Sequence, residues 1–224
     1  MMFVKNLINK FALLMFFIIS GNNVCLAQQF AKEIAAFKHQ DSIQVPTKNA
    51  ILFVGSSSFT KWKDVSNYFP KHSIINRGFG GSTLPDVITY EQEVIFKYRP
   101  KQIVIYCGEN DVASSDSVSG KIVCERFKNL FSDIRKKFPH TSVIYISMKP
   151  CPLRWSMKKR LIEGNILIKK YLTKQKHARF INVWNAMLDR KGKPRKEIFG
   201  EDNLHMNAKG YSIWAKLLEP YLLK

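Results

Sequence analysis

Four short stretches of the sequence combine nucleophilic, basic and hydrogen-bonding residues. A serine hydroxyl is a weak nucleophile until a base takes its proton, and histidine suits that role near neutral pH. An aspartate three residues before a histidine can accept the Nδ1 proton and orient the ring. The stretches are Gly55-Ser56-Ser57-Ser58, Gly78-Phe79-Gly80-Gly81-Ser82, Gly108-Glu109-Asn110-Asp111 and Asp202-Asn203-Leu204-His205. Together they favour nucleophilic catalysis, provided that the fold brings them to one place.

Each stretch taken alone also has a plainer structural interpretation. The serines at 56 to 58 suit the cap of a following helix, and Asn110 and Asp111 suit a turn. A lone His205 is typical of a helix start or a surface, and Gly80 and Gly81 are typical of a loop. Four such signals in one chain order favour a site over four separate coincidences.

Short apolar runs alternate with stretches of helical periodicity along the chain, which predicts where these residues lie. We expect strands at residues 50–54, 73–76, 102–107, 142–148 and 179–183. We expect helices around residues 30–37, 62–69, 85–95, 123–138, 157–172 and 208–222. This order predicts βαβ units, a parallel sheet and helices on both faces, that is, a three-layer α/β fold. Three of the four stretches directly follow predicted strands, so they should meet at one edge of the sheet.

The four stretches, in this order, resemble the conserved blocks of the SGNH hydrolases, also called the GDSL esterase/lipase family. Residues 76–83 are similar to the family's second block and residues 202–211 to its last. The resemblance covers the chain from residue 28 onward. It implies a flavodoxin-like sheet of five parallel strands in the order 2-1-3-4-5.

The resemblance also implies a role for each matching residue. Ser57 matches the nucleophile, His205 the general base and Asp202 the carboxylate that orients the imidazole. The backbone N–H groups of Ser57 and Gly81 and the side-chain amide of Asn110 match the oxyanion donors. One departure concerns Ser56, which stands where the family usually has an aspartate that helps to brace the turn.

The implied function is that of a serine esterase with an acyl-enzyme intermediate and no metal or organic cofactor. Its expected substrates are small-molecule or glycan esters with short acyl groups, including O-acetyl groups. The alternatives are a lysophospholipase or thioesterase of the same fold, or a non-catalytic binding module for anionic polymers. The residues that could line the acyl or sugar site are Phe59, Trp62, Phe79, Arg154 and Trp155, with core packing as the alternative for the aromatic ones.

The first 27 residues have the pattern of a signal peptide. Lys5 and Lys10 precede an apolar run at residues 11–19, and the small residues Cys25 and Ala27 suit a cleavage site before Gln28. The run is short for a spanning helix, which needs about 20 residues, so we favour cleavage over an uncleaved anchor. We therefore expect a signal peptide at 1–27, one domain at 28–224, and export to the periplasm or the medium.

The net charge of +19 is unevenly distributed along the chain. Residues 121–224 hold 24 Lys and Arg against 8 Asp and Glu. Export argues against nucleic acid as the partner, which leaves weak contact with an anionic surface, or solubility alone. Three cysteines follow the predicted cleavage site, an odd number that is not typical of a disulfide framework, although pairing of Cys124 with Cys151 stays open. Four histidines show no metal-ligand spacing: His39, His72, His140 and His177.

Overall fold

A computed structural model describes residues 29–224 of the protein. The chain divides into two units after Ile43. The described part of the first unit is residues 29–43, which contain the predicted first helix, α2 (Ala31–Ile43). The second unit, Gln44–Lys224, contains the sheet and all of the features below. The predicted signal peptide lies outside the described residues, and the single domain from residue 28 stays a prediction.

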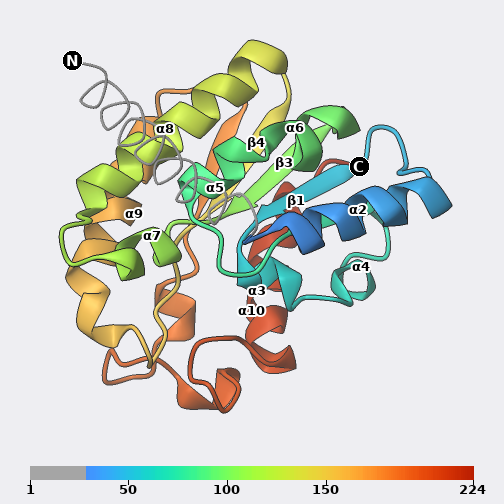
Figure 1. The fold of residues 1–224 in the computed structure, drawn as a ribbon. Coiled ribbons are helices and arrows are strands. Elements are labelled where there is room, and N and C mark those ends of the chain that lie inside the picture. The colour runs from blue at the N-terminus through green and yellow to red at the C-terminus, as the bar shows by residue number, and fades with distance from the viewer. Residues whose placement is uncertain (1–28) are drawn as a thin grey trace, which may run out of the picture. The chain divides into compact units, whose positions relative to one another are not determined.

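The second unit is built on a sheet of five parallel strands in the order β2-β1-β3-β4-β5 (Figure 1). This is the order that the resemblance implied. The central strands β1 and β3 are buried along their whole length, as expected for apolar runs covered on both faces. The strands are β1 (Ile51–Gly55), β2 (Ile74–Gly78), β3 (Gln102–Tyr106), β4 (Ser142–Ile146) and β5 (Ala178–Ile181).

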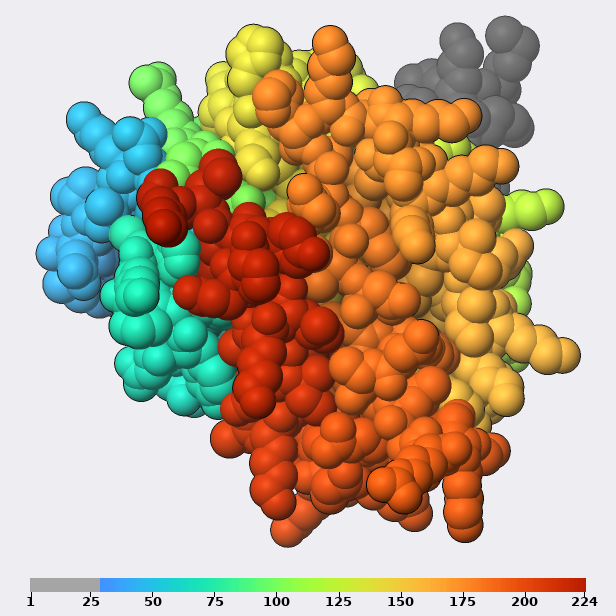
Figure 2. Space-filling view, turned by 180° about the vertical axis from the view of Figure 1, so that it is seen from behind, coloured from blue at the N-terminus to red at the C-terminus, as the bar shows by residue number. Residues whose placement is uncertain are grey.

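Side chains alternate between the two faces of the sheet, and a different set of helices covers each face. On one face, Tyr106 packs against Trp214 of α10 (Ala208–Leu218) with ring centroids 4.6 Å apart. On the other, Tyr145 packs against Phe127 of α8 (Gly120–Lys137) at 4.7 Å. Helices α3 (Ser57–Thr60), α4 (Val65–Tyr68) and α10 lie on the first face, and Figure 2 shows the red C-terminal segment with α10 along the back of the unit.

Helices lie where the sequence predicts them, but those predicted at 62–69 and 208–222 are shorter and the one at 85–95 is divided into two. Two further short helices, after β1 and after β3, were not predicted. The longer helices are α8 (Gly120–Lys137), α9 (Lys158–Leu172) and α10 (Ala208–Leu218). The shorter ones are α3 (Ser57–Thr60), α4 (Val65–Tyr68), α5 (Leu84–Thr89), α6 (Glu91–Val94) and α7 (Glu109–Ser114). Single 3-10 turns complete the fold: η1 (Phe96–Tyr98), η2 (Trp155–Met157), η3 (Asn185–Met187), η4 (Lys196–Ile198) and η5 (Glu219–Tyr221). Among the described residues, none of the helices combines the length and the apolar character needed to cross a bilayer.

Candidate active site

The turn after β1 places Ser57 at the carboxyl edge of the sheet. Gly55 ends the strand with φ of 140°, and a Cβ atom there would overlap the carbonyl of Tyr106 on β3. Only glycine suits that conformation and that close approach. The N–H of Ser56 then donates to the same carbonyl (3.0 Å), and Ser57 becomes the first residue of α3. The sharp turn leaves the Ser57 side chain partly exposed, between the buried Ser56 and Ser58.

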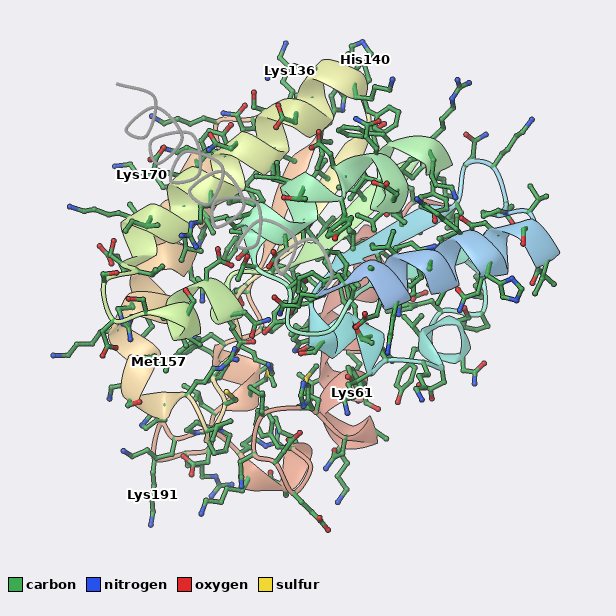
Figure 3. The ribbon with its side chains drawn as sticks, in the orientation of Figure 1. Lys61, Lys136, His140, Met157, Lys170 and Lys191 are labelled. Carbon is green, nitrogen blue, oxygen red and sulfur yellow. The ribbon has the colours of Figure 1, made fainter. Side chains whose placement is uncertain are left out.

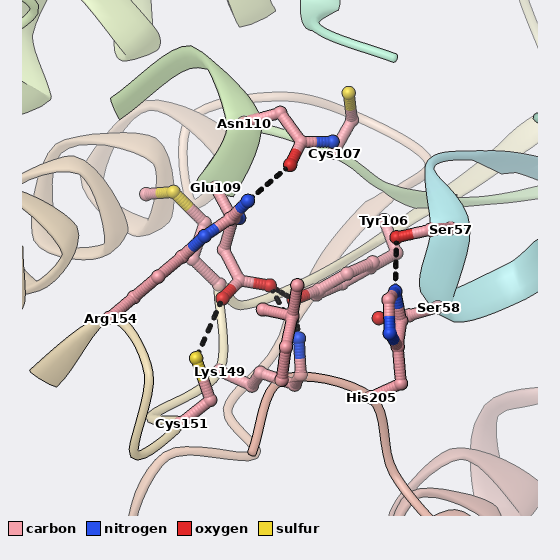
Figure 4. A network of polar contacts seen from close by, with 12 residues as sticks. Ser57, Ser58, Tyr106, Cys107, Glu109, Asn110, Lys149, Cys151, Arg154 and His205 are labelled. Atoms are coloured by element: carbon pink, nitrogen blue, oxygen red, sulfur yellow. Dashed lines mark hydrogen bonds and ion pairs between the residues drawn. The ribbon is translucent and has the colours of Figure 1, made fainter. Parts of the chain in front are cut away.

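Ser57, His205 and Asp202 form a continuous hydrogen-bonded chain. The imidazole Nε2 of His205 lies 2.9 Å from the Ser57 hydroxyl, and Nδ1 lies 2.6 Å from Oδ2 of Asp202 (Figure 4 shows the first bond). An ionised carboxylate can only accept, so Nδ1 carries the proton and a neutral imidazole accepts from the serine through Nε2. The three residues predicted from widely separated stretches are thus in direct contact, in the geometry needed to transfer a proton from serine to histidine.

Asp202 is fixed in its ionised form by several donors. Besides the imidazole, the backbone N–H groups of Leu204 and His205 donate to its Oδ1 at 3.0 and 2.9 Å. These bonds, led by the one from His205, hold the pKa of the Asp202 carboxyl well below its usual range. Half of this side chain is exposed, so solvent screens part of the effect. The carboxylate is therefore charged at any pH at which the imidazole can act as a base.

The loop that carries Asp202 and His205 is held by its own backbone and by the cap of α10. Gly200 donates its N–H to the His205 carbonyl at 2.8 Å. Asn207 caps α10 by accepting from the N–H of Lys209, and its amide donates back to the Phe199 carbonyl. The start of α10 after His205, which the sequence predicted, thus holds the histidine loop in place.

The loops that carry the predicted oxyanion donors are joined by hydrogen bonds of Ser82. Gly81 has a positive φ of 83° and is exposed, and its N–H donates to no other residue of the described chain. The next residue, Ser82, is fully buried and donates through its hydroxyl to the Gly55 carbonyl (3.2 Å). The carbonyl of Ser82 accepts from the side-chain amide of Asn110 (2.9 Å). Ser82 therefore joins the loops that carry Ser57, Gly81 and Asn110, a role that sequence reasoning did not assign to it.

The candidate residues for lining the substrate site divide into two groups. Phe59, Trp62 and Phe79 are fully buried. They pack in the core, which was the alternative interpretation for these aromatic residues, and they cannot contact a substrate. Arg154 and Trp155 are partly exposed. Of the five candidates, these two alone remain available to a ligand.

A buried polar network beside Asn110 was not predicted. Glu109 and Lys149 form an ion pair at 2.7 Å, with 3% and 1% of their side chains exposed. Tyr106 donates its hydroxyl to the same carboxylate, and the Cys151 thiol lies 3.8 Å from its other oxygen (Figure 4). Glu109 belongs to a predicted motif, but nothing in the sequence links it to a lysine forty residues later. Burial and the nearby Glu109 raise the pKa of the Cys151 thiol to about 11.

Cys107, Cys124 and Cys151 are free and buried, so the pairing of Cys124 with Cys151 that the sequence left open is not formed. Within residues 29–224, no group of three or more His, Cys, Asp or Glu side chains is arranged to hold a metal ion.

The fold and the arrangement of serine, histidine and aspartate define an α/β protein with the geometry of a serine hydrolase. Residues 41–213 match the sequence model of the GDSL-like Lipase/Acylhydrolase family. The chain therefore belongs to that family, and ester hydrolysis is the class of reaction that this membership assigns to it.

The individual proteins that the chain resembles have low sequence identity to it. The Bacillus subtilis uncharacterized protein YpmR is 30% identical over 98 residues, which span 41% of this chain and 37% of that protein. A Streptococcus pneumonia protein named for platelet activating factor is similar in structure, with a TM-score of 0.77, 19% identity and coverage of 92% of this chain and 99% of that one. A GDSL-like lipase from Bacteroides thetaiotaomicron has a TM-score of 0.70 at 20% identity, over 84% and 95% of the two chains. An acetyl-xylooligosaccharide esterase from Geobacillus Stearmophilus has a TM-score of 0.62 at 13% identity, over 80% and 97%.

Proposed function

We propose that the protein is an exported serine esterase that hydrolyses short-chain acyl esters, including O-acetyl groups on glycans, with Ser57 as nucleophile. The observation that carries this proposal is the hydrogen-bonded chain from Ser57 through His205 to Asp202. A serine that is merely a helix cap would have no reason to face an imidazole that is itself held by a carboxylate.

The chemistry follows from these contacts. His205 takes the Ser57 proton through Nε2 as the serine oxygen attacks the ester carbonyl, and the imidazolium that forms is stabilised by Asp202. The carbonyl oxygen becomes an oxyanion, to which Asn110 and the N–H groups of Ser57 and Gly81 donate. The imidazolium gives its proton to the departing alcohol, which leaves the acyl group on Ser57. A water then attacks this acyl-enzyme with His205 again as base, and the acid is released.

Proteins of similar fold support the proposed substrate class. Two proteins of similar fold are described as an acetyl-xylooligosaccharide esterase and a family 3 carbohydrate esterase. Both descriptions favour esters of carbohydrates, and a lysophospholipase or thioesterase of the same fold is the alternative. Hydrolysis rates for acetylated glycans, lysophospholipids and p-nitrophenyl esters of increasing chain length distinguish these activities.

A fluorophosphonate probe tests the nucleophile directly. The probe should label Ser57 alone, because this serine has the imidazole beside it, and mass spectrometry of the labelled peptide identifies the site. Ser57→Ala should abolish both labelling and p-nitrophenyl acetate hydrolysis. Ser56→Ala and Ser58→Ala are the matched controls and should keep both. An adduct on Ser56 or Ser58, or folded wild-type protein that neither reacts nor hydrolyses esters, would refute the proposal and favour a binding module.

A further inference from the structure

The side-chain amide of Asn110 is held from both sides. Its Nδ2 donates to the Ser82 carbonyl (2.9 Å), and its Oδ1 accepts from the guanidinium of Arg154 (2.7 Å; Figure 4). A guanidinium has five donors and no acceptor, so the second bond determines which end of the amide is oxygen. The amide nitrogen is thereby kept on the side of Ser82, the residue next to Gly81.

The loop that carries Arg154 is bonded to the segments that carry Asn110 and His205. At its start, Lys149 forms the buried ion pair with Glu109, the neighbour of Asn110. Just before Arg154, the N–H of Leu153 donates to the carbonyl of Asn203 (3.1 Å), between Asp202 and His205. Because residues on this loop are bound both to the loop of Asn110 and to the loop of His205, the guanidinium has little freedom to leave the amide.

We propose that Arg154 is a positioning residue that orients and polarises Asn110 as an oxyanion donor. The inference rests on the proposed function and adds to it a residue outside the family's motif blocks. A charge-assisted bond to Oδ1 holds the amide plane and draws electron density from the N–H group, which makes it a stronger donor. Both effects grow in importance as negative charge develops on the substrate, so Arg154 acts on the transition state more than on substrate binding.

Arg154 has a second conceivable role, because it is partly exposed and uses one of its donors on Asn110. It could bind an acidic group of the substrate. The two roles predict different kinetics. A positioning residue changes kcat and depends on Asn110, whereas a substrate-binding residue changes KM and acts whether or not Asn110 is present.

A double-mutant cycle on a neutral ester, p-nitrophenyl acetate, tests the proposal. Arg154→Met should lower kcat by about 10- to 100-fold, the loss expected for a hydrogen bond to a charged group, and leave KM within about twofold. In an Asn110→Ala background the same substitution should lower kcat by less than about threefold, because the group that Arg154 positions is gone. Arg154→Lys keeps the charge but not the planar donor geometry, and should fall between Arg154→Met and wild type.

Lys136→Met is the matched control for the loss of a positive charge. Lys136 lies on α8 and pairs with Asp133 at 2.8 Å, so kcat of this variant should stay at the wild-type value. Equal losses from Arg154→Met with and without Asn110, or a kcat on this neutral ester that Arg154→Met leaves unchanged, would overturn this inference while the proposed function stands. Wild-type protein that is inert to both ester and fluorophosphonate would overturn the proposed function, and this inference with it. Only variants whose near-ultraviolet circular dichroism spectrum is that of the wild type are compared, because these are folded.

Discussion

The amide of Asn110 lies in the first turn of α7, after β3, in contact with the residue that follows Gly81. If this amide donates to the oxyanion, its bond strengthens as the ester carbonyl becomes tetrahedral. Asn110→Ala should then lower kcat by about 10²- to 10³-fold and leave KM nearly unchanged. Stopped-flow or steady-state hydrolysis of p-nitrophenyl acetate measures both constants. A folded Asn110→Ala protein with near-normal kcat would show that Asn110 is only a turn residue and does not donate to the oxyanion.

Asp202 holds the His205 tautomer that can accept from serine. Asp202→Asn would donate to Nδ1 instead of accepting from it, so Nε2 would carry the proton and could not act as a base. We expect kcat to fall by roughly 10³- to 10⁴-fold. Fluorophosphonate labelling should slow in proportion, and retention of the wild-type rate would show that His205 needs no orienting partner.

The same carboxyl also makes stability depend on pH. Its pKa is depressed in the folded state, so its contribution to the free energy of unfolding is present above the unfolded pKa of about 3.9 and is lost as pH falls below it. The difference in the free energy of unfolding between wild type and Asp202→Asn should therefore become smaller as the pH falls below about 4. Urea unfolding at a series of pH values measures it, and a constant difference would contradict the assigned direction.

The residues that sequence reasoning identified are those whose role is local. Asp202 and His205 are separated by one turn, and Gly81 needs a positive φ that glycine supplies. Ser82 and Arg154 were missed as supports of Asn110 because their bonds to it cross 28 and 44 residues of sequence. No periodicity or motif encodes such pairings, which depend on how the strands are ordered in the sheet.

The strands were predictable because each is a short apolar run, and their bounds agree within a few residues. The predicted helix at 85–95 was wrong in its continuity. Thr83 and Asp86 form a capping box that starts α5, with Pro85 in the first turn, but the helix stops at Thr89 and resumes as α6. Likewise the last helix ends at Leu218, because Pro220 cannot continue it and a 3-10 turn follows. Apolar spacing indicates which face of a helix is buried, but it does not show where the helix is interrupted or ends.

The ion pair between Glu109 and Lys149 links the start of α7 to the loop after β4. Breaking a buried pair by removing one partner leaves an uncompensated charge, and costs about 3–5 kcal/mol. Lys149→Met should therefore lower the free energy of unfolding by about that amount, as measured by urea denaturation. Adding Glu109→Gln should recover a large part of the lost free energy of unfolding, because it removes the buried carboxylate that no longer has a partner. A loss below about 1 kcal/mol, the range of surface pairs, would mean that water reaches this network.

At the scale of the whole molecule, the excess of positive charge is spread over many directions. Figure 3 shows Lys136, Lys170 and Lys191 pointing outward from separate parts of the second unit. On α9, one of the basic residues is bound within the protein. Arg160 is bound to Asp116 (2.9 Å) and to the carbonyls of Val112, Ser115 and Val118, so it braces the loop before α8. Lys159, Lys169 and Lys170 are exposed and remain available.

Exposed apolar side chains lie next to these lysines on α9. Ile162 and Ile166 are 38% and 59% exposed, between Lys159 and Lys169 along the helix. A helix face that mixes lysines with isoleucines suits weak contact with an anionic surface, where charge attracts and apolar side chains add area. The same face serves equally well as a solvated surface if no partner meets it.

We expect weak, salt-dependent binding of the protein to acidic polysaccharide or to vesicles with anionic lipid. Exposed charges act over about 8 Å at physiological ionic strength, so binding should weaken strongly between low and high salt. Replacing Lys158, Lys159, Lys169 and Lys170 by glutamine should abolish it. The matched control replaces the exposed Lys48, Lys61, Lys63 and Lys71, which changes the net charge equally. If both variants lose binding to the same extent, net charge alone is responsible and α9 has no special role. Binding that persists unchanged at high salt would exclude the electrostatic mechanism.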